Sequence, residues 1–392
     1  MRPSLPSFIT PRLAVLASAH FTIDLYSSFF LPLLPLLLTR LGLNYTLIGS
    51  LVALGSMSSS FSQPLFGLLS DRLSRPWFVA LGPLVAACFL ASIGAAPTYA
   101  ALVALLVLGG VGVAAFHPQT ASLAGVSSPR RAMAMSFWVT GGTLGWALGP
   151  LYATTAVRLF GLDRTWIAAI PGVVMSLVLL VWLSRLRALP HAERVRTRLS
   201  DLRPVWRPLL LLYLVVVTRS AVSSGFATFL PLLMHERGWS VAAGGAITTA
   251  YLTAGALGGF AGGWLADRVG AQRVVRTSFA AAMPFYVAFF LVPEKFGLVL
   301  LIAGYALLQC SLPINVVLGQ ELSPRHASTI SSLLMGAAWG VGALLVGPIG
   351  ALADHAGLRV ALMALSGLIV PGFFCALALP RPTPTLVTTA VS

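Results

Sequence analysis

Apolar residues in this chain form long runs that are separated by short polar segments. A helix needs about 20 mostly apolar residues to cross a bilayer. Twelve runs meet that length, near residues 13–38, 48–69, 77–95, 98–124, 132–157, 165–184, 208–234, 242–265, 274–293, 297–320, 327–353 and 358–379. The pattern predicts an all-α integral membrane protein with an N-terminal bundle at 1–184, a polar linker at 185–207 and a C-terminal bundle at 208–392.

The composition supports a membrane protein. The 392 residues are 57% hydrophobic and only 9% charged, too little charge to cover a soluble protein of this length. The net charge of +15 lies in the short segments between apolar runs, which favours control of topology over binding to nucleic acid. The letters "ASA" at 17–19 are typical of a signal-peptidase site, but the preceding apolar stretch is too short, so we expect an uncleaved first helix.

The distribution of basic residues predicts the orientation. With the N-terminus inside, the cytoplasmic segments hold eighteen arginines, seven of them in 185–207, whereas the outer loops hold five arginines and Lys295. We therefore expect a multi-pass protein of the plasma (inner) membrane with both termini cytoplasmic. Its short loops and two complete bundles predict a monomer. Three widely spaced cysteines give no metal or disulfide pattern, and the single lysine excludes a phosphate-binding loop ending in lysine.

Several short strings occur once in each half. "GLLSDRLSR" at 67–75 returns as "GWLADRVGAQR" at 263–273, and "SPRR" at 128–131 returns as "SPRH" at 323–326, at offsets of 196 and 195 residues. "FLPLL" also occurs twice, at 30–34 and 229–233. Six spans separate the copies, so the two halves are predicted to be repeats in the same orientation.

Together these features resemble the major facilitator superfamily. "HFTID" at 20–24, "AAFHP" at 114–118 and "GGTLGWALGP" at 141–150 are similar, more narrowly, to the fosmidomycin-resistance branch of drug efflux proteins. The resemblance implies a 6+6 pseudo-symmetric fold of twelve helices and transport of a small molecule rather than an enzymatic reaction. It also implies no cofactor, with a proton gradient as the energy source.

Two charged residues lie inside predicted spans. Asp24 interrupts the first span, where a central carboxylate costs about 2.5–3.5 kcal/mol, and the repeat offset of 195 places Arg219 at the equivalent position of the seventh span. Parallel repeats put equivalent residues at one depth. We predict that Asp24 and Arg219 face a central aqueous cavity and can approach each other, so that protonated Asp24 releases Arg219 to an anionic or polar substrate. The structural alternative is a static ion pair between the halves.

Other polar residues extend this prediction along the same helices. His20 lies one turn before Asp24 and is a candidate proton relay, or a residue hydrogen-bonded to a backbone carbonyl. His117 stands beside Pro118, where we expect a break in the helix that borders the cavity. The candidate substrate-binding residues, each with small-residue packing as its alternative, are His117, Gln119, Thr120, Ser27, Ser223, Gln309, Ser311 and Asn315.

Two further motifs have structural explanations. The resemblance implies that the loops after the second and eighth spans act as a cytoplasmic gate, through Asp71, Arg72, Arg75, Asp267, Arg268 and Arg273. The fifth span carries a glycine-rich stretch with Gly141, Gly145, Gly149 and Pro150, similar to the antiporter motif of the superfamily. Glycines four apart place one small-residue face on a helix, so close helix packing alone explains that stretch.

Asp24 and Arg219 favour proton-coupled antiport, and the resemblance to drug efflux proteins implies efflux of small organic molecules by alternating access. The alternative on the same fold is a symporter or facilitator for uptake of sugars or other metabolites. A membrane enzyme with a metal held by His20, Asp24 and His117 is a weaker alternative, as is a non-transporting receptor, and we expect no metal. The expected partners are a small-molecule substrate, protons and the lipid bilayer.

Overall fold

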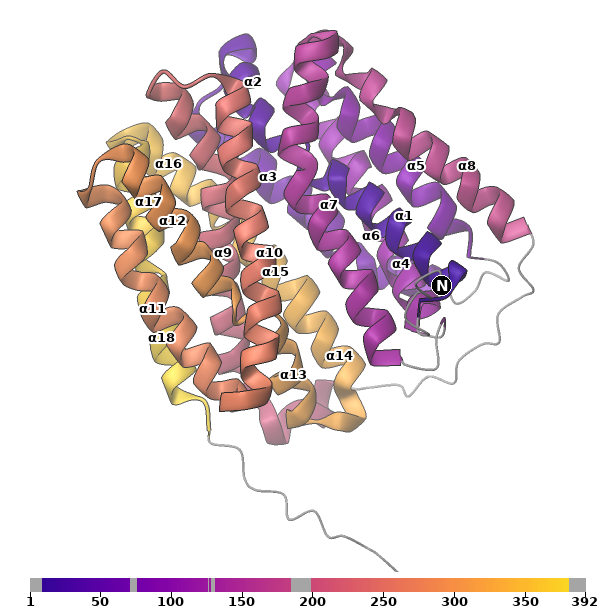
Figure 1. Ribbon diagram of the computed structural model, residues 1–392, viewed down its shortest axis with the longest axis vertical. Coiled ribbons are helices and arrows are strands. Elements are labelled where there is room, and N and C mark those ends of the chain that lie inside the picture. The colour runs from indigo at the N-terminus through magenta and orange to yellow at the C-terminus, as the bar shows by residue number, and fades with distance from the viewer. Residues whose placement is uncertain (1–8, 71–75, 126, 128–130, 185–198, 381–392) are drawn as a thin grey trace, which may run out of the picture.

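The computed structural model describes residues 9–70, 76–125, 127, 131–184 and 199–380, which are almost entirely helical (Figure 1). The first half contains α1 (Pro11–Ser27), α2 (Leu34–Leu41), α3 (Tyr45–Ser60), α4 (Gln63–Ser70), α5 (Trp77–Ala91), α6 (Tyr99–Gly125), α7 (Arg131–Phe160) and α8 (Ile170–Ser184). The second contains α9 (Trp206–Glu236), α10 (Val241–Val269), α11 (Ala271–Leu291), α12 (Glu294–Gln309), α13 (Leu312–Leu322), α14 (Ala327–Ser332), α15 (Ala338–Leu344), α16 (Val346–Ala356), α17 (Leu358–Gly367) and α18 (Ile369–Ala378). Short 3-10 segments occur at Leu31–Leu33, Ser92–Ala95, Leu162–Ala169, Leu199–Val205 and Pro324–His326, and a π-helical turn at Leu333–Ala337.

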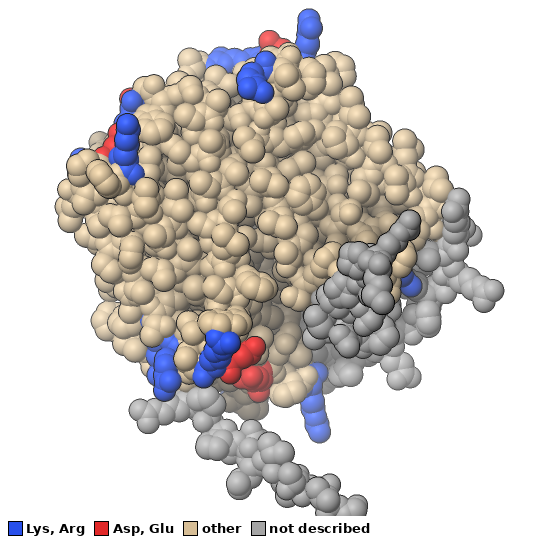
Figure 2. Space-filling model, viewed as in Figure 1, with Lys and Arg blue, Asp and Glu red and all other residues tan. Residues whose placement is uncertain are grey.

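The exterior has the character of a membrane protein. Figure 2 shows one face of the molecule, with charged side chains toward its two ends and a broad uncharged belt between them. Within the described residues, ten helical segments are long and apolar enough to span a bilayer. The 30-residue α7 is not among them although its length suffices, because its hydropathy is too low. The all-helical membrane fold is confirmed, whereas the hydropathy criterion does not give the expected count of twelve.

Several predicted spans are interrupted. The first span changes to a 3-10 segment at Leu31–Leu33 between α1 and α2, where Pro32 and Pro35 supply no backbone N–H. The tenth is divided between α12 and α13 next to Pro313. By contrast, α6 continues through Pro118, so the break expected there is absent. Membrane helices tolerate a proline where neighbouring groups compensate for the lost hydrogen bond.

The turns confirm the internal repeat. Gly42 ends α2 with φ +60°, and Gly238, 196 residues later, has φ +81° between α9 and α10. After each turn a side-chain oxygen caps the next helix: Asn44 accepts from the Leu47 N–H, and Ser240 accepts from the Ala243 N–H. Equivalent turns with equivalent caps indicate that the two halves are structural copies.

The halves meet mainly through α3, which packs against α15 and α16, and through α7, which packs against α10. The segment from Leu31 to the end of α2 adds smaller contacts with α9 and α10. Small residues permit the contact of α3, since a Cβ on Gly49 of α3 would lie 2.5 Å from the Val346 carbonyl oxygen of the other half. Along the chain α8 ends at Ser184 and α9 begins at Trp206, with 185–198 outside the described residues.

Polar contacts join the halves at the end where α3 begins. The Asp354 carboxylate on α16 accepts hydrogen bonds from the backbone N–H groups of Tyr45 (2.8 Å) and Thr46 (2.9 Å), and from the Thr46 hydroxyl. The Tyr45 hydroxyl also donates to Glu236 at the end of α9. Asp354 thus caps the N-terminus of a helix that belongs to the opposite half, and we call these contacts the Asp354 latch.

Candidate functional site

Asp24 lies at the centre of a cluster formed by α1 and α6. Its carboxylate is 3.2 Å from the Nε2 atom of His20, one turn earlier on α1, and 3.5 Å from the Nε2 atom of His117 on α6. The Asp24 and His117 side chains are 17% and 21% exposed, so solvent reaches the cluster in part. We call His20, Asp24 and His117 the proton cluster, because the hydrogen bonds among these side chains depend on which of them carries a proton.

Both imidazoles are fixed by backbone carbonyls. The Nδ1 atom of His20 lies 2.9 Å from the Trp138 carbonyl oxygen, and the Nδ1 atom of His117 lies 2.8 Å from the Val113 carbonyl oxygen. A carbonyl oxygen only accepts, so each Nδ1 donates its proton there. In a neutral imidazole the Nε2 atom then presents a lone pair to the Asp24 carboxylate. Each contact with Asp24 becomes a hydrogen bond only when it holds an added proton.

The neighbouring helix α7 fixes His20 further. The Trp138 ring stacks on the His20 imidazole with centroids 3.9 Å apart and an angle of 24°. Gly142 lies against the same imidazole, because a Cβ on Gly142 would collide with the Nε2 atom. Sequence reasoning missed both residues. Their spacing of four on one helix face was visible, but the part that binds His20 is a backbone oxygen, which no residue type reveals.

The same three side chains also have the chemistry of a metal site. Their ligand atoms lie within 4.8 Å of one another, and histidine nitrogens with a carboxylate suit several divalent transition metals. The sequence led us to expect no metal, and protons alone account for the hydrogen bonding of the cluster. Metal analysis of the purified protein distinguishes the two interpretations.

Arg219 forms a separate site in the C-terminal half. It lies on α9 and is only 3% exposed, and its Nη1 group donates to the Gln309 side-chain oxygen at 2.8 Å. Gln309 in turn donates to the Tyr305 hydroxyl at 3.1 Å. The guanidinium carbon stands 5.3 Å from the centroid of the Trp339 ring, within the range of a cation–π contact. The C-terminal site therefore consists of one cation and neutral partners.

Asp24 and Arg219 do not form an ion pair in this conformation. Among the described residues Asp24 is paired with the two histidines, and no carboxylate lies within 4.0 Å of Arg219. Each charge has partners within its own half. Their expected approach stays a prediction for another arrangement of the halves.

The remaining predicted binding residues fall into three groups. Three hydroxyls bond within their own helices: Ser27 to the Ile23 carbonyl, Thr120 to that of Phe116, and Ser311 to that of Leu308. Ser223 donates to Gln309 at 3.4 Å and so belongs to the Arg219 site. Two buried amides keep polar atoms without partners, namely the Gln119 oxygen and both side-chain atoms of Asn315. The two amides are the best placed to bind a ligand, because their polar atoms have no partner within the protein.

The predicted gate and glycine motif differ in how far the structure describes them. Asp71, Arg72 and Arg75 lie outside the described residues, whereas Asp267 and Arg268 lie exposed in the last turn of α10, and Arg273 lies exposed in the first turns of α11. Arg268 stacks over the Trp264 ring at 3.5 Å.

The glycine motif lies on α7 and faces α1. A Cβ on Gly141 would lie 2.7 Å from the Ala17 carbonyl oxygen, and one on Gly145 or Gly149 would collide with α1 as well. Pro150 follows within the same helix. The predicted close packing is confirmed, while the antiporter role of the motif stays a prediction.

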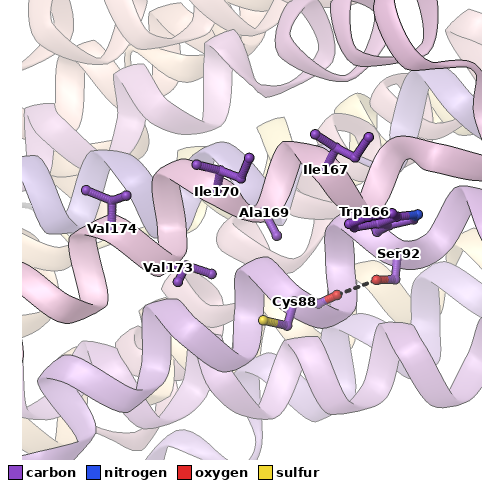
Figure 3. A pocket seen from close by; sticks show the side chains of 8 residues that line it. All are labelled: Cys88, Ser92, Trp166, Ile167, Ala169, Ile170, Val173 and Val174. Atoms are coloured by element: carbon purple, nitrogen blue, oxygen red, sulfur yellow. Dashed lines mark hydrogen bonds between the residues drawn. The ribbon is translucent and has the colours of Figure 1, made fainter.

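One apolar hollow is lined by none of the residues of either site. It has a volume of about 350 Å³ and lies between α5 and the segment that leads into α8, lined by Cys88, Ser92, Trp166, Ile167, Ala169, Ile170, Val173 and Val174 (Figure 3). Its one hydroxyl, on Ser92, already donates to the Cys88 carbonyl. Trp166 and Ile170 are 54% and 58% exposed, so this apolar hollow opens on the outside of the bundle, where lipid chains would fill it.

Comparison with known sequences decides the family. The chain matches the Major Facilitator Superfamily over residues 16–347 and 212–391. It belongs to that superfamily. The protein is therefore a multi-pass membrane transporter of small molecules and not an enzyme.

Individual relatives agree with this assignment. The chain is 26% identical over 361 residues to the fosmidomycin resistance protein of Escherichia coli (strain K12), covering 89% of this chain and 87% of that protein. It is 27% identical over 363 residues to a probable 4-methylmuconolactone transporter of Cupriavidus pinatubonensis, with coverage of 88% and 82%.

Solved structures agree on the fold. A bacterial homologue of the human lysosomal transporter Spinster superposes with a TM-score of 0.81 at 18% identity, over 96% of this chain and 98% of that one. The nucleoside transporter NupG superposes with a TM-score of 0.72 at 16% identity, over 95% and 100% of the two chains.

Proposed function

We propose that this superfamily member is a proton-coupled antiporter that exports small organic molecules by alternating access. It would act as a monomer in the plasma membrane with both termini in the cytoplasm. The observation that carries the proposal is the proton cluster, in which two imidazoles present Nε2 lone pairs to the Asp24 carboxylate within 3.5 Å. Such a group of acceptors binds and releases protons at membrane depth.

Protons and substrate would compete for the same lone pairs. A substrate that donates a hydroxyl or amine hydrogen to Asp24 or His117 requires those atoms to be unprotonated. Substrate bound from the cytoplasm would therefore leave the cluster without its added proton, and a proton from outside would displace the substrate. Mutually exclusive binding of this kind is the thermodynamic requirement for antiport.

The predicted orientation implies which state of the transport cycle, inward-facing or outward-facing, this structure represents. The Asp354 latch lies at the end where α3 and α10 begin, which the arginine distribution places outside the cell. A transporter whose halves are tied at its outer end faces inward. We infer that the outward-facing state forms when the latch opens and the cytoplasmic gate closes.

Export rather than uptake is supported by the comparisons and by the glycine motif of α7. The relative from Escherichia coli is named for resistance to fosmidomycin, which efflux of a toxic compound would produce. The glycine motif of α7 also resembles that of antiporters. One observation favours the alternative of symport, because the proton cluster and Arg219 have separate partners and can be occupied together.

A transport assay with Asp24→Asn tests the coupling. Susceptibility of cells that lack or overproduce the protein, against a drug panel that includes fosmidomycin, first identifies a transported compound. Its pH-driven movement is then measured in proteoliposomes. We expect Asp24→Asn to abolish the response to the pH gradient, because the amide cannot carry the proton. Transport that stays fully proton-driven in this variant would exclude Asp24 as the coupling group.

Two controls sharpen that assay. Asp163→Asn removes a carboxylate that pairs with Arg40 and has a 76% exposed side chain, so it should leave transport unchanged. Substrate affinity measured against pH separates the two directions. Antiport predicts tighter substrate binding as pH rises, since protons compete, whereas tighter binding as pH falls would establish symport instead.

A further inference from the structure

We propose that Arg219 is the binding site for an anionic group, so that the substrate is a small organic acid bearing a carboxylate or a phosphonate. The proposal rests on the function proposed above, because it names the substrate class of that transporter. It assigns the proton to the N-terminal half and the substrate's negative charge to the C-terminal half.

The first argument is that Arg219 carries an uncompensated charge. Its side chain is 3% exposed, no carboxylate of the described residues lies within 4.0 Å, and its Nε group has no hydrogen-bond partner. A buried arginine that lacks both a counter-ion and part of its hydrogen bonding is costly. Such a cost is retained where a ligand supplies the missing charge.

The second argument is that its neighbours hold the guanidinium without neutralising it. The Gln309 oxygen accepts from Arg219 and from Ser223, while the Gln309 amide nitrogen donates to the Tyr305 hydroxyl. These bonds fix which end of the amide faces the arginine. All the partners are neutral, so they position the planar donor fork of Arg219 and leave its charge for a bidentate anion.

The third argument concerns one residue on each of two helices that pack against α9, Asn315 on α13 and Trp339 on α15. Asn315 is 1% exposed on α13, which packs against α9, and neither of its side-chain polar atoms has a partner. An amide of this kind can donate to a second oxygen of an anion. Trp339 lies under the guanidinium yet is 39% exposed, which offers an apolar surface beside the charge. The fitting ligand combines an anionic group with an apolar body.

The proposal is tested by binding at equilibrium, with no proton gradient. Benzoate and phenylphosphonate are the anionic probes, and benzamide is the neutral probe of nearly the same shape. Calorimetry and thermal shift on the purified full-length protein measure their affinities. We expect the anions to bind at least about tenfold more tightly than benzamide, and Arg219→Gln to remove that difference.

Matched variants identify the side chain that is responsible for the preference for anions. Arg276→Gln is the arginine control. Arg276 lies near the start of α11 and donates to the Ala376 and Leu379 carbonyls at the end of α18, so this variant should keep the preference for anions. Arg219→Lys keeps the charge but loses the fork and should weaken phenylphosphonate binding severalfold. If Arg219→Gln does not fold, Gln309→Leu replaces it, since loss of the positioning oxygen should reduce the same preference.

The opposing results are equally specific. Equal affinity for benzoate and benzamide, a preference for anions that survives in the Arg219 variants, or no binding of any probe up to about 10 mM would overturn the proposal. Asp24→Asn separates it from the coupling mechanism. Benzoate has no hydrogen to donate to Asp24, so this variant should lose proton coupling and still bind benzoate as tightly as the wild type. Failure of proton-driven transport with an intact preference for anions would reject only the antiport.

Discussion

At the scale of single residues, the proton cluster shows how a carboxylate is accommodated inside a membrane protein. Asp24 lies beside two imidazoles, and each imidazole has its Nδ1 atom at a backbone carbonyl, with the Trp138 ring also stacked on His20. The His20 partner, the Trp138 carbonyl, lies on a different helix, so a small movement of α7 relative to α1 changes the position of His20. Proton affinity and helix packing are coupled at this residue.

Gly142→Ala tests that coupling. The added Cβ would collide with the His20 imidazole and displace it from the Trp138 carbonyl, with loss of a buried hydrogen bond of about 1 kcal/mol. We expect proton-driven transport to fall about fivefold or more, measured in proteoliposomes. Gly347→Ala is the control, since a Cβ there meets nothing within 4 Å. Equal activity of both variants would show that the position of His20 is unimportant.

At the scale of secondary-structure elements, α7 serves two contacts at once. Its glycine face lies directly on the α1 backbone, while the helix also packs against α10 of the other half. Its glycines lower its hydropathy below that of the ten candidate spans among the described residues, and the helix packs between α1 and α10. The motif that resembles an antiporter signature is, physically, a way to bring two helix backbones together.

Gly145→Ala measures how much the contact between α7 and α1 contributes to the free energy of unfolding. The nearest atom to the added Cβ is the Phe21 backbone oxygen, which cannot move aside as a side chain would. We expect a loss of about 1–3 kcal/mol, the usual cost of overpacking, and a lower unfolding temperature in detergent. Gly244→Ala on α10 meets only ordinary contacts at 3.8 Å and should unfold like the wild type. Unchanged stability of Gly145→Ala would mean that α1 and α7 separate at little cost.

At the scale of the whole molecule, the two halves are tied at one end by the Asp354 latch. One carboxylate caps the first turn of α3 across the interface, where the positive end of the helix dipole faces it. The position 196 residues earlier is Arg158, so the repeat supplies no carboxylate at the equivalent place in the N-terminal half. The latch therefore breaks the symmetry that the duplication would otherwise impose.

Asp354→Ala should open this end of the molecule. Spin labels on the exposed residues Thr39 and Val360, in a background without the three native cysteines, report the distance between the halves. We expect the population with the longer distance to rise about tenfold, since the variant loses all three hydrogen bonds to the carboxylate. Asp163→Asn, whose partner Arg40 is in the same half, should leave the distribution unchanged. A distribution unaffected by Asp354→Ala would show that packing alone closes this end.

The sequence by itself determined the membrane character, the repeat and the residues that carry charge into the bilayer. These follow from composition, from the length of the apolar runs and from a fixed offset, all of which are properties of the chain read in one dimension. It also placed His20 and Asp24 on one helix face, because residues four apart share a face.

Only the tertiary structure decided which groups meet. Which side chains meet depends on the rotation and tilt of neighbouring helices. The repeat offset paired Asp24 with Arg219, whereas in the folded protein Asp24 lies beside His117 and Arg219 donates a hydrogen bond to Gln309. The Trp138 carbonyl and the Tyr45 N–H group were invisible for a different reason. Every residue has such backbone groups, and only the fold selects the few that remain free to bind a side chain from another helix.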